Sequence, residues 1–282
     1  MSVMERQLDL PVRDGAVRLT EADHRALSSA VLSLENPGLA ARLTSLAGTP
    51  VELMGKMLPP GASGIISAAV TKGLDAALAV ALRTMRNGPQ AGSHLFHRAL
   101  AAASGAIGGS FGLATLAVEL PISTIIMLRS IADIARSEGE DLRSPETALA
   151  CVEVFALGGR PGADAAESGY FAVRSVLATS VTEAARFIAR RGIVEPGAPV
   201  IVRFIAQVGS RFGAVVTQKF AVQAVPVIGA VGGAAVNYAF IDHFQTVARA
   251  HFTIRRLERS YGKDVVRSEY ELLRRDAGRK VA

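Results

Sequence analysis

Two stretches without a charged side chain, Ala99–Val118 and Phe220–Ile241, limit the folds open to this chain. An α-helix rises about 1.5 Å per residue and the hydrocarbon core of a bilayer is about 30 Å thick, so each stretch could form a spanning helix. Each therefore predicts a long helix that is either buried in a protein core or surrounded by lipid.

The many glycines and the polar residues of the second stretch favour the first of these alternatives, burial in a protein core. Pairs such as Gly108 and Gly112, or Gly229 and Gly233, are four residues apart and lie on one helical face. A glycine face lets two backbones approach closely, both in membranes and in tightly packed soluble cores. The many glycines lower helix propensity, and polar residues and a proline in the second stretch lower its hydropathy. We favour buried core helices, with an integral membrane protein as the alternative.

Helical patterns dominate the rest of the chain, and neither a sustained alternation of period two nor a βαβ rhythm occurs. We expect a first helix near residues 21–34. Further helices are expected at 62–86, 92–118, 121–138, 144–158, 165–191, 198–221, 226–260 and 263–277. The sequence predicts an all-α fold without a substantial sheet. Its parts would be an irregular lead-in (1–20), one multi-helix domain with buried glycine-rich helices (21–277) and a short basic tail (278–282).

Composition restricts the cellular context. Lys and Arg outnumber Asp and Glu by 31 to 25, and most of this excess lies beyond Asp242. Such a bias suits an anionic membrane surface, although a solvated helix face is the more common explanation. The patterns of nucleic-acid-binding proteins are absent, so no such partner is expected. The N-terminus lacks the layout of a secretion signal, which predicts a cytoplasmic location, with a peripheral position on the inner face of the membrane as an option.

Three polar residues stand in apolar surroundings. Glu119 and Asn237 follow the two glycine faces at helical spacing, and Arg129 lies among isoleucines in a helix that we expect to begin at Pro121. A helix that is apolar all round is normally buried, so we expect Arg129 to be interior and to need an acceptor. A buried unpaired polar group costs about 1–3 kcal/mol, so each of the three should have a partner. For the two charged residues, Glu119 and Arg129, structural roles are a simpler explanation than catalytic ones.

Motifs of enzymes are weak. Gly108-Gly109-Ser110-Phe111-Gly112 matches G-x-S-x-G, but its surroundings predict helix on both sides, whereas a nucleophile elbow needs a strand before the serine. His94 and His97 could share a helical face without any further ligand. Cys151 is the sole cysteine and stands in an apolar helical context, where it should pack as a small hydrophobic residue. No cofactor and no metal is expected.

Four segments together resemble the EcsC family of bacterial proteins. They are "ENPGLAARLTSLAGTPVELMGKMLP", "KGLDAAL", "GGSFGLATLAVELPISTIIMLRSIADIARSEGED" and "VPVIGAVGGAAVNYAFIDHFQTVARAHFTIRRLERSYG", which span residues 32–262 in order. The resemblance implies that the recurrent polar positions, our candidates for a site, are Lys72, Asp75, Glu119, Arg129, Asp141 and Asn237. Where Glu119 stands the family would have Asp, and where Glu138 stands it usually has an aromatic residue.

Two hypotheses on function follow from this resemblance. The family is named after a protein encoded beside an ABC transporter that affects secretion and competence, which implies an accessory role linked to the membrane or to a membrane transport or secretion complex. Some members carry a peptidase label, so the alternative is a hydrolase, peptidase-like or esterase-like, that uses the polar cluster or Ser110.

Overall fold

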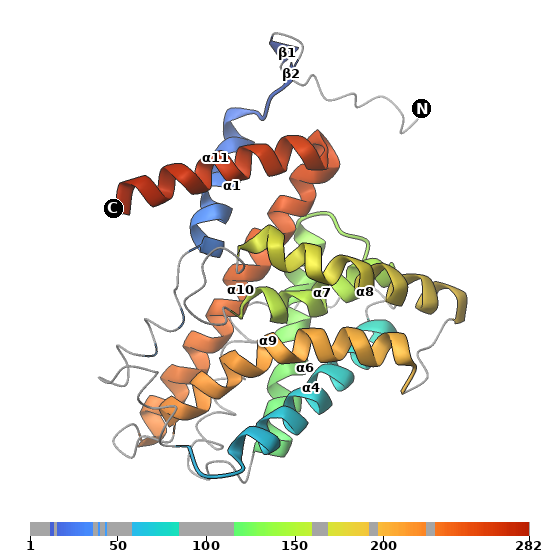
Figure 1. Cartoon of the computed structure of the whole chain (residues 1–282), viewed down its shortest axis with the longest axis vertical. Coiled ribbons are helices and arrows are strands. Elements are labelled where there is room, and N and C mark those ends of the chain that lie inside the picture. The colour runs from blue at the N-terminus through green and yellow to red at the C-terminus, as the bar shows by residue number, and fades with distance from the viewer. Residues whose placement is uncertain are drawn as a thin grey trace. The chain divides into compact units, whose positions relative to one another are not determined.

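The computed structural model describes residues 12–13, 16–35, 39, 43, 58–84, 116–159, 169–191, 197–223 and 229–281 (Figure 1). Its helices are α1 (Glu21–Glu35), α4 (Ala62–Thr84), α6 (Leu116–Ser137), α7 (Pro145–Leu157), α8 (Tyr170–Arg191), α9 (Pro199–Gln223), α10 (Gly229–Tyr261) and α11 (Lys263–Val281). The described strands are β1 (Val12–Arg13) and β2 (Ala16–Val17), which pair antiparallel. The all-α prediction is confirmed.

Local chemistry sets the ends of α7. Ser144 has an extended backbone, and its side chain accepts a hydrogen bond from the Glu146 N–H in the first turn. Pro145 occupies the first helical position, where its missing N–H costs nothing. Gly158 ends the helix, with its own N–H bonded to Val154 O. Helix 144–158 was therefore predicted to within one residue at each end.

Three expectations concern the uncharged stretches and the helix start at Pro121. The helix expected at 92–118 lies outside the described residues except for 116–118, which belong to α6. The prediction that a new helix begins at Pro121 is wrong, because α6 already begins at Leu116 and continues through the proline. Of the second stretch, Phe220–Gln223 belong to α9 and the residues from Gly229 belong to α10, whereas residues 224–228 lie outside the described residues.

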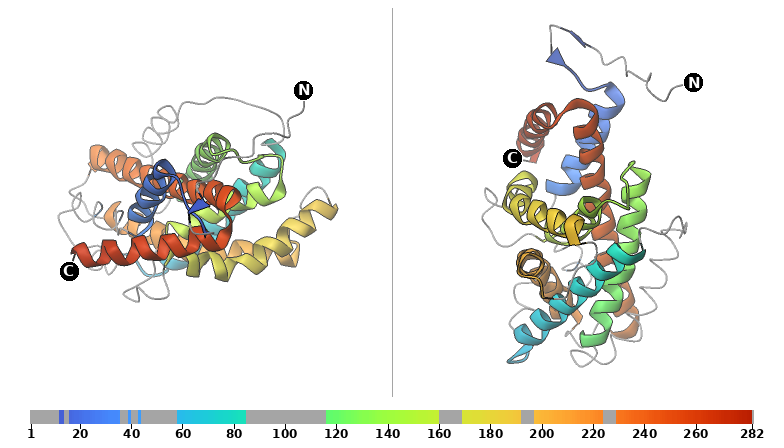
Figure 2. Two further views of the ribbon diagram at one scale, coloured as in Figure 1. Left: turned by 90° about the horizontal axis from the view of Figure 1, so that it is seen from above. Right: turned by 90° about the vertical axis from the view of Figure 1, so that its right-hand side faces the viewer.

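The contacts divide the chain into two compact units. Unit 1 comprises Met1–Asn36 and Ala250–Ala282, and unit 2 comprises Pro37–Arg249, so α10 contributes residues to both. In unit 2, α4 packs against α6, α7 and α9, and α7 also packs against α6, α8 and α9. Helices α8 and α9 pack together on one side of this unit and α6 lies on the other (Figure 2).

Aromatic rings fill the centre of unit 2. Phe155 of α7, Phe212 of α9 and Phe244 of α10 are mutually in contact, with centroids 4.9 Å apart for Phe155–Phe212 and 5.4 Å apart for Phe155–Phe244. Phe240 extends the cluster at 5.1 Å from Phe244. All four are buried. Aromatic residues make up only 5% of the chain, and four of them lie where these three helices meet, where tilted ring pairs add to the energy of burial.

Unit 1 is tied together by Asp23 at the start of α1. Its carboxylate accepts hydrogen bonds from Tyr261 Oη at 2.7 Å, Arg256 Nη1 at 3.0 Å and Thr20 Oγ1 at 2.9 Å. Desolvation raises the pKa of Asp23, but these three hydrogen bonds outweigh it and hold the pKa below the ordinary value of 3.8. A second link joins Tyr270 Oη of α11 to Glu35 at 2.6 Å.

The close contact behind α7 gives a first prediction. A Cβ added to Gly159 would lie 2.5 Å from the backbone O of Arg211, whereas one added to Gly213 in α9 would meet nothing within 4 Å. Gly159→Ala should lower the free energy of unfolding by about 1–3 kcal/mol, because backbone must move. Gly213→Ala should leave it unchanged or raise it by up to about 1 kcal/mol. Urea unfolding followed by circular dichroism would measure both, and equal effects would contradict the packing.

The hydrogen bonds of Asp23 give a second prediction, on the pH dependence of stability. Since the folded state favours the ionised carboxylate, its contribution is present above pH 3.8 and lost as the pH falls through the lowered pKa. Asp23→Asn should reduce the free energy of unfolding by about 1–2 kcal/mol at neutral pH, and the difference from the wild type should shrink below about pH 3.8. Tyr261→Phe should give a smaller loss. A pH-independent difference would argue against this role.

Candidate functional site

The six candidate residues separate into two groups. Glu119 and Asn237 are buried, with 8% and 1% of their surface exposed. The other four, Lys72, Asp75, Arg129 and Asp141, are exposed. The candidates therefore do not gather into one site. Of the six, only Glu119 and Asn237 can take part in interactions of the protein interior.

Glu119 has an ion-pair partner that the sequence analysis did not identify. Lys219 Nζ donates to Glu119 Oε1 at 3.1 Å, across a separation of 100 residues in the chain. The lysine side chain is completely buried and that of the glutamate is 6% exposed. Glu119 lies in the first turn of α6, where the positive end of the helix also favours a carboxylate. The expectation that Glu119 is buried and paired is confirmed.

Aromatic faces complete the surroundings of the lysine. Nζ of Lys219 lies 5.3 Å from the ring centroid of Phe220, its neighbour on α9, and 5.1 Å from that of Phe240 on α10. Such contacts partly replace the lost hydration of an ammonium group. Burial lowers the pKa of Lys219, and the charge and hydrogen bond of Glu119 oppose this shift. The arrangement keeps the charge away from water, since the lysine side chain has no exposed surface and that of Glu119 is 6% exposed.

Asn237 belongs to the same part of the interior. It precedes Phe240 by one turn of α10, so it shares a helical face with the ring that contacts Lys219. Its neighbours Val236 and Phe240 are also buried. The expectation that Asn237 is buried is confirmed.

The prediction that Arg129 is interior is wrong. Its side chain is exposed, because the apolar residues around it include an outward-facing set. Val118 is 64% exposed and Ile122 is 48% exposed, and both lie on the same outer face of α6 as Arg129. Asp133, the acceptor considered from the sequence, instead contacts Arg136 at 3.3 Å. An apolar sequence on all sides of a helix did not here mean burial on all sides.

The remaining exposed candidates have separate settings. Lys72 and Asp75 lie on the outer face of α4, and partial desolvation raises the pKa of Asp75. Asp141 lies in the loop before α7, where it accepts hydrogen bonds from the N–H and from Nε of Arg143. These bonds hold the pKa of Asp141 below its ordinary value. Asp141 thus shapes a turn.

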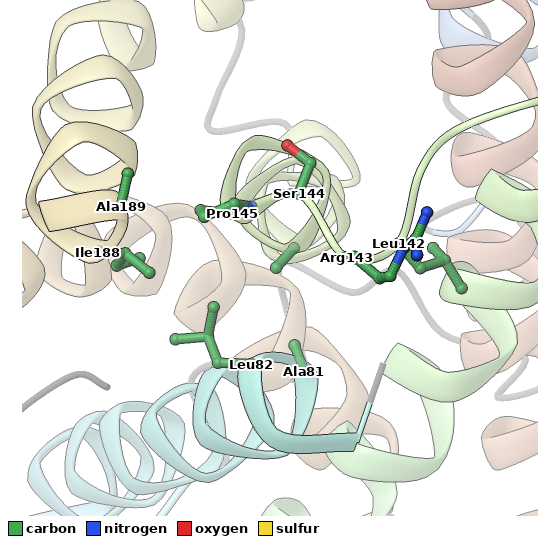
Figure 3. Close-up of a pocket in the computed structure, with 9 residues that line it drawn as sticks. Ala81, Leu82, Leu142, Arg143, Ser144, Pro145, Ile188 and Ala189 are labelled. Atoms are coloured by element: carbon green, nitrogen blue, oxygen red, sulfur yellow. The ribbon is translucent and has the colours of Figure 1, made fainter. Parts of the chain in front are cut away.

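A cavity of about 280 Å³ lies beside that turn (Figure 3). It is bounded by the last turns of α4, the start of α7 and the end of α8, and Leu82 and Ile188 face one another across it. Ser144 Oγ points away from Leu82 and accepts the capping hydrogen bond of α7. The polar atoms at the rim are thus engaged in local structure, and Glu119, Lys219 and Asn237 are not among the lining residues.

The enzyme motifs do not gain support from this geometry. Ser110, His94 and His97 lie outside the described residues. Within the described ranges, no three His, Cys, Asp or Glu side chains are grouped so that they could hold a metal ion. Cys151 is buried in α7, as expected of a small hydrophobic residue.

Lys219 was missed although the sequence contained a signal for it. Glu119 is the first charged residue after the first uncharged stretch, and Lys219 is the last charged residue before the second. Charges at the edges of two stretches that the sequence predicts to be buried are natural partners, because each must be compensated within the core. The separation of the pair along the chain leaves no local pattern that would join the two.

The buried pair gives a third prediction. Lys219→Met and Glu119→Gln should each lower the free energy of unfolding by about 3–5 kcal/mol, because each leaves an uncompensated or underbonded partner in the core. The double variant should cost much less than the sum, with a coupling energy of about 2 kcal/mol or more. Urea unfolding of all four proteins measures the cycle.

The exposed pair Arg203–Glu183, at 3.3 Å, is the matched control. Its cycle, built from Arg203→Met and Glu183→Gln, should give a coupling energy below about 1 kcal/mol, because both groups are solvated. Additive effects at Lys219 and Glu119 would show that the buried groups do not depend on one another.

Comparison with known proteins agrees with the family resemblance of the four segments. No curated protein and no solved structure matches the sequence. Residues 23–257, which begin within α1 and end within α10, match the EcsC protein family. The chain therefore belongs to the EcsC protein family.

Proposed function

We propose that this EcsC protein is a helical accessory protein that attaches peripherally to the inner face of the cell membrane and there serves a membrane transport or secretion complex. The observation that supports attachment most is the outer surface of α8 and α9. This α8–α9 surface, as we use the term, combines exposed or half-buried apolar side chains with arginines, and consists of Val176, Phe187, Val200, Val202, Arg186, Arg190, Arg191 and Arg203.

Apolar residues on this surface would enter the interfacial region of a bilayer. Val176 is 60% exposed and Val202 is 52% exposed. A basic surface with exposed apolar side chains is typical of proteins that lie in the plane of the membrane interface, where apolar burial and attraction to anionic lipids act together. The net charge of +6 favours the same environment.

Crossing the membrane is the alternative mode of attachment. Among the described helices, Ala62–Arg83 and Pro199–Val222 are long and apolar enough to span a bilayer, with mean hydropathies of 1.7 and 1.4, but core helices of soluble proteins meet the same criterion. Lys72 and Asp75 lie midway along the first, on its exposed face. A charge at the bilayer centre costs about 2.5–3.5 kcal/mol, so we favour attachment at the surface.

Cell fractionation provides the fourth prediction. The wild type should sediment with membranes at low salt and be released by a carbonate wash. Val176→Ser/Val202→Ser should shift partitioning toward the soluble fraction by about tenfold, because two partly exposed valines no longer gain from leaving water. A wild type found wholly in the first soluble fraction would refute attachment, and resistance to carbonate would indicate an integral protein.

A matched control is available on the other side of unit 2. Val118→Ser/Ile122→Ser removes two similarly exposed apolar side chains from α6. This variant should partition like the wild type. If it were released while the α8 and α9 variant stayed bound, attachment would be through α6 and not through the α8–α9 surface.

A further inference from the structure

A groove in the α8–α9 surface combines an apolar floor with a basic rim. It has a volume of about 480 Å³ and is lined by Glu183, Arg186, Phe187, Arg190, Arg191 and Val200. Phe187 and Val200 are half-buried and supply apolar contact area, whereas Arg186 and Arg190 are exposed. The groove therefore offers two kinds of contact within a short distance.

The described residues do not compensate the charge of the groove. Within the described part of the chain, Arg186 and Arg190 have neither a hydrogen-bond nor an ion-pair partner. Cζ of Arg191 lies 5.5 Å from the ring centroid of Phe187, which orients this guanidinium over the groove. Glu183, the carboxylate among the described lining residues, is already paired with Arg203 at 3.3 Å. Three positive charges thus remain available to a ligand.

Stabilisation of the helix end is the simpler explanation for part of this cluster. Arg190 and Arg191 lie in the last turn of α8, where cations interact favourably with the helix dipole. That effect falls off within one turn, so it does not account for Arg186, and it does not account for an apolar floor. The C-terminal basic region expected from the sequence differs, because Arg256, Arg274 and Arg279 there contact carboxylates.

We propose that this groove binds the phosphate headgroup of an anionic phospholipid. Arg186 and Arg190 would hold the phosphate, because planar guanidinium groups match phosphate oxygens with two parallel hydrogen bonds. Phe187 and Val200 would contact the glycerol and the first methylenes of the acyl chains. Bases of a nucleic acid fit less well, since the one aromatic ring of the lining is half-buried and already faces Arg191. This inference rests on the proposed membrane attachment and names the class of lipid that the groove would select.

Vesicle sedimentation with the full chain tests the inference. We compare vesicles of phosphatidylcholine with vesicles in which phosphatidylglycerol replaces part of it, for the wild type and for Arg186→Gln/Arg190→Gln. The wild type should prefer the anionic vesicles, and the double variant should lose about thirtyfold in affinity for them while binding neutral vesicles as before. Arg186→Lys/Arg190→Lys should recover only part of the loss, because lysine keeps the charge without the planar fork.

Arg25→Gln/Arg275→Gln is the control of equal charge. Both arginines are exposed, and within the described ranges neither has a hydrogen-bond or ion-pair partner. This variant should lose no more than about threefold in affinity, because its charges lie outside the groove. Equal losses of affinity in the two glutamine variants would show that net charge alone explains the effect, and would contradict lipid binding in the groove.

The other outcomes separate the two proposals. Equal binding of the wild type to neutral and anionic vesicles would contradict the binding of anionic lipid in the groove but would leave the proposed membrane attachment in place. Failure to bind either kind of vesicle overturns both. If inorganic phosphate or a short RNA binds in a manner that depends on Arg186 and Arg190, without any preference for anionic vesicles, then the occupant is not a lipid and the inference is wrong.

Discussion

A lysine without exposed surface retains its charge only if the protein replaces the water that it has lost, and this requirement organises unit 2. Lys219 of α9 meets Glu119 of α6 at 3.1 Å, with the ring of Phe240 from α10 against its ammonium group. Three helices must therefore be placed correctly for one charge to be tolerated. A buried pair of this kind adds little net stability over an apolar core of the same shape, but it penalises every arrangement of α6 and α9 that would separate the two groups.

The fold was predictable from the sequence because its signals are local. Ser144 and Pro145 mark the start of α7, and Gly158 marks its end, without reference to any distant part of the chain. The same holds for the helical period that defines α4, α8 and α11. The position of Pro121 was ambiguous, since a proline near the beginning of a helix is compatible either with its first residue or with its second turn, as in α6. The division into two units depends on long-range contacts, which periodicity does not contain.

The site was only partly predictable, since burial of an individual residue depends on the face that a helix turns inward. Glu119 and Asn237 were expected to be buried because each follows a glycine face at helical spacing in the sequence, and both are buried. Arg129 was expected to be buried on the strength of its isoleucine neighbours, but some of those neighbours face outward with it. Lys219 stands alone in its segment, so its partner could be found only once α6 and α9 were brought together.

The buried ion pair and the basic, partly apolar surface proposed for membrane attachment are separate features of the protein. The burial of the ion pair can be tested most directly. Lysine footprinting of the native protein with an amine-reactive ester, read by mass spectrometry, compares Lys219 with the exposed Lys72 and Lys263. We predict that both exposed lysines are modified while Lys219 stays protected until the protein unfolds. Modification of Lys219 at the rate of the exposed lysines in the folded protein would contradict a buried ion pair and, with it, the arrangement of α6, α9 and α10 described above.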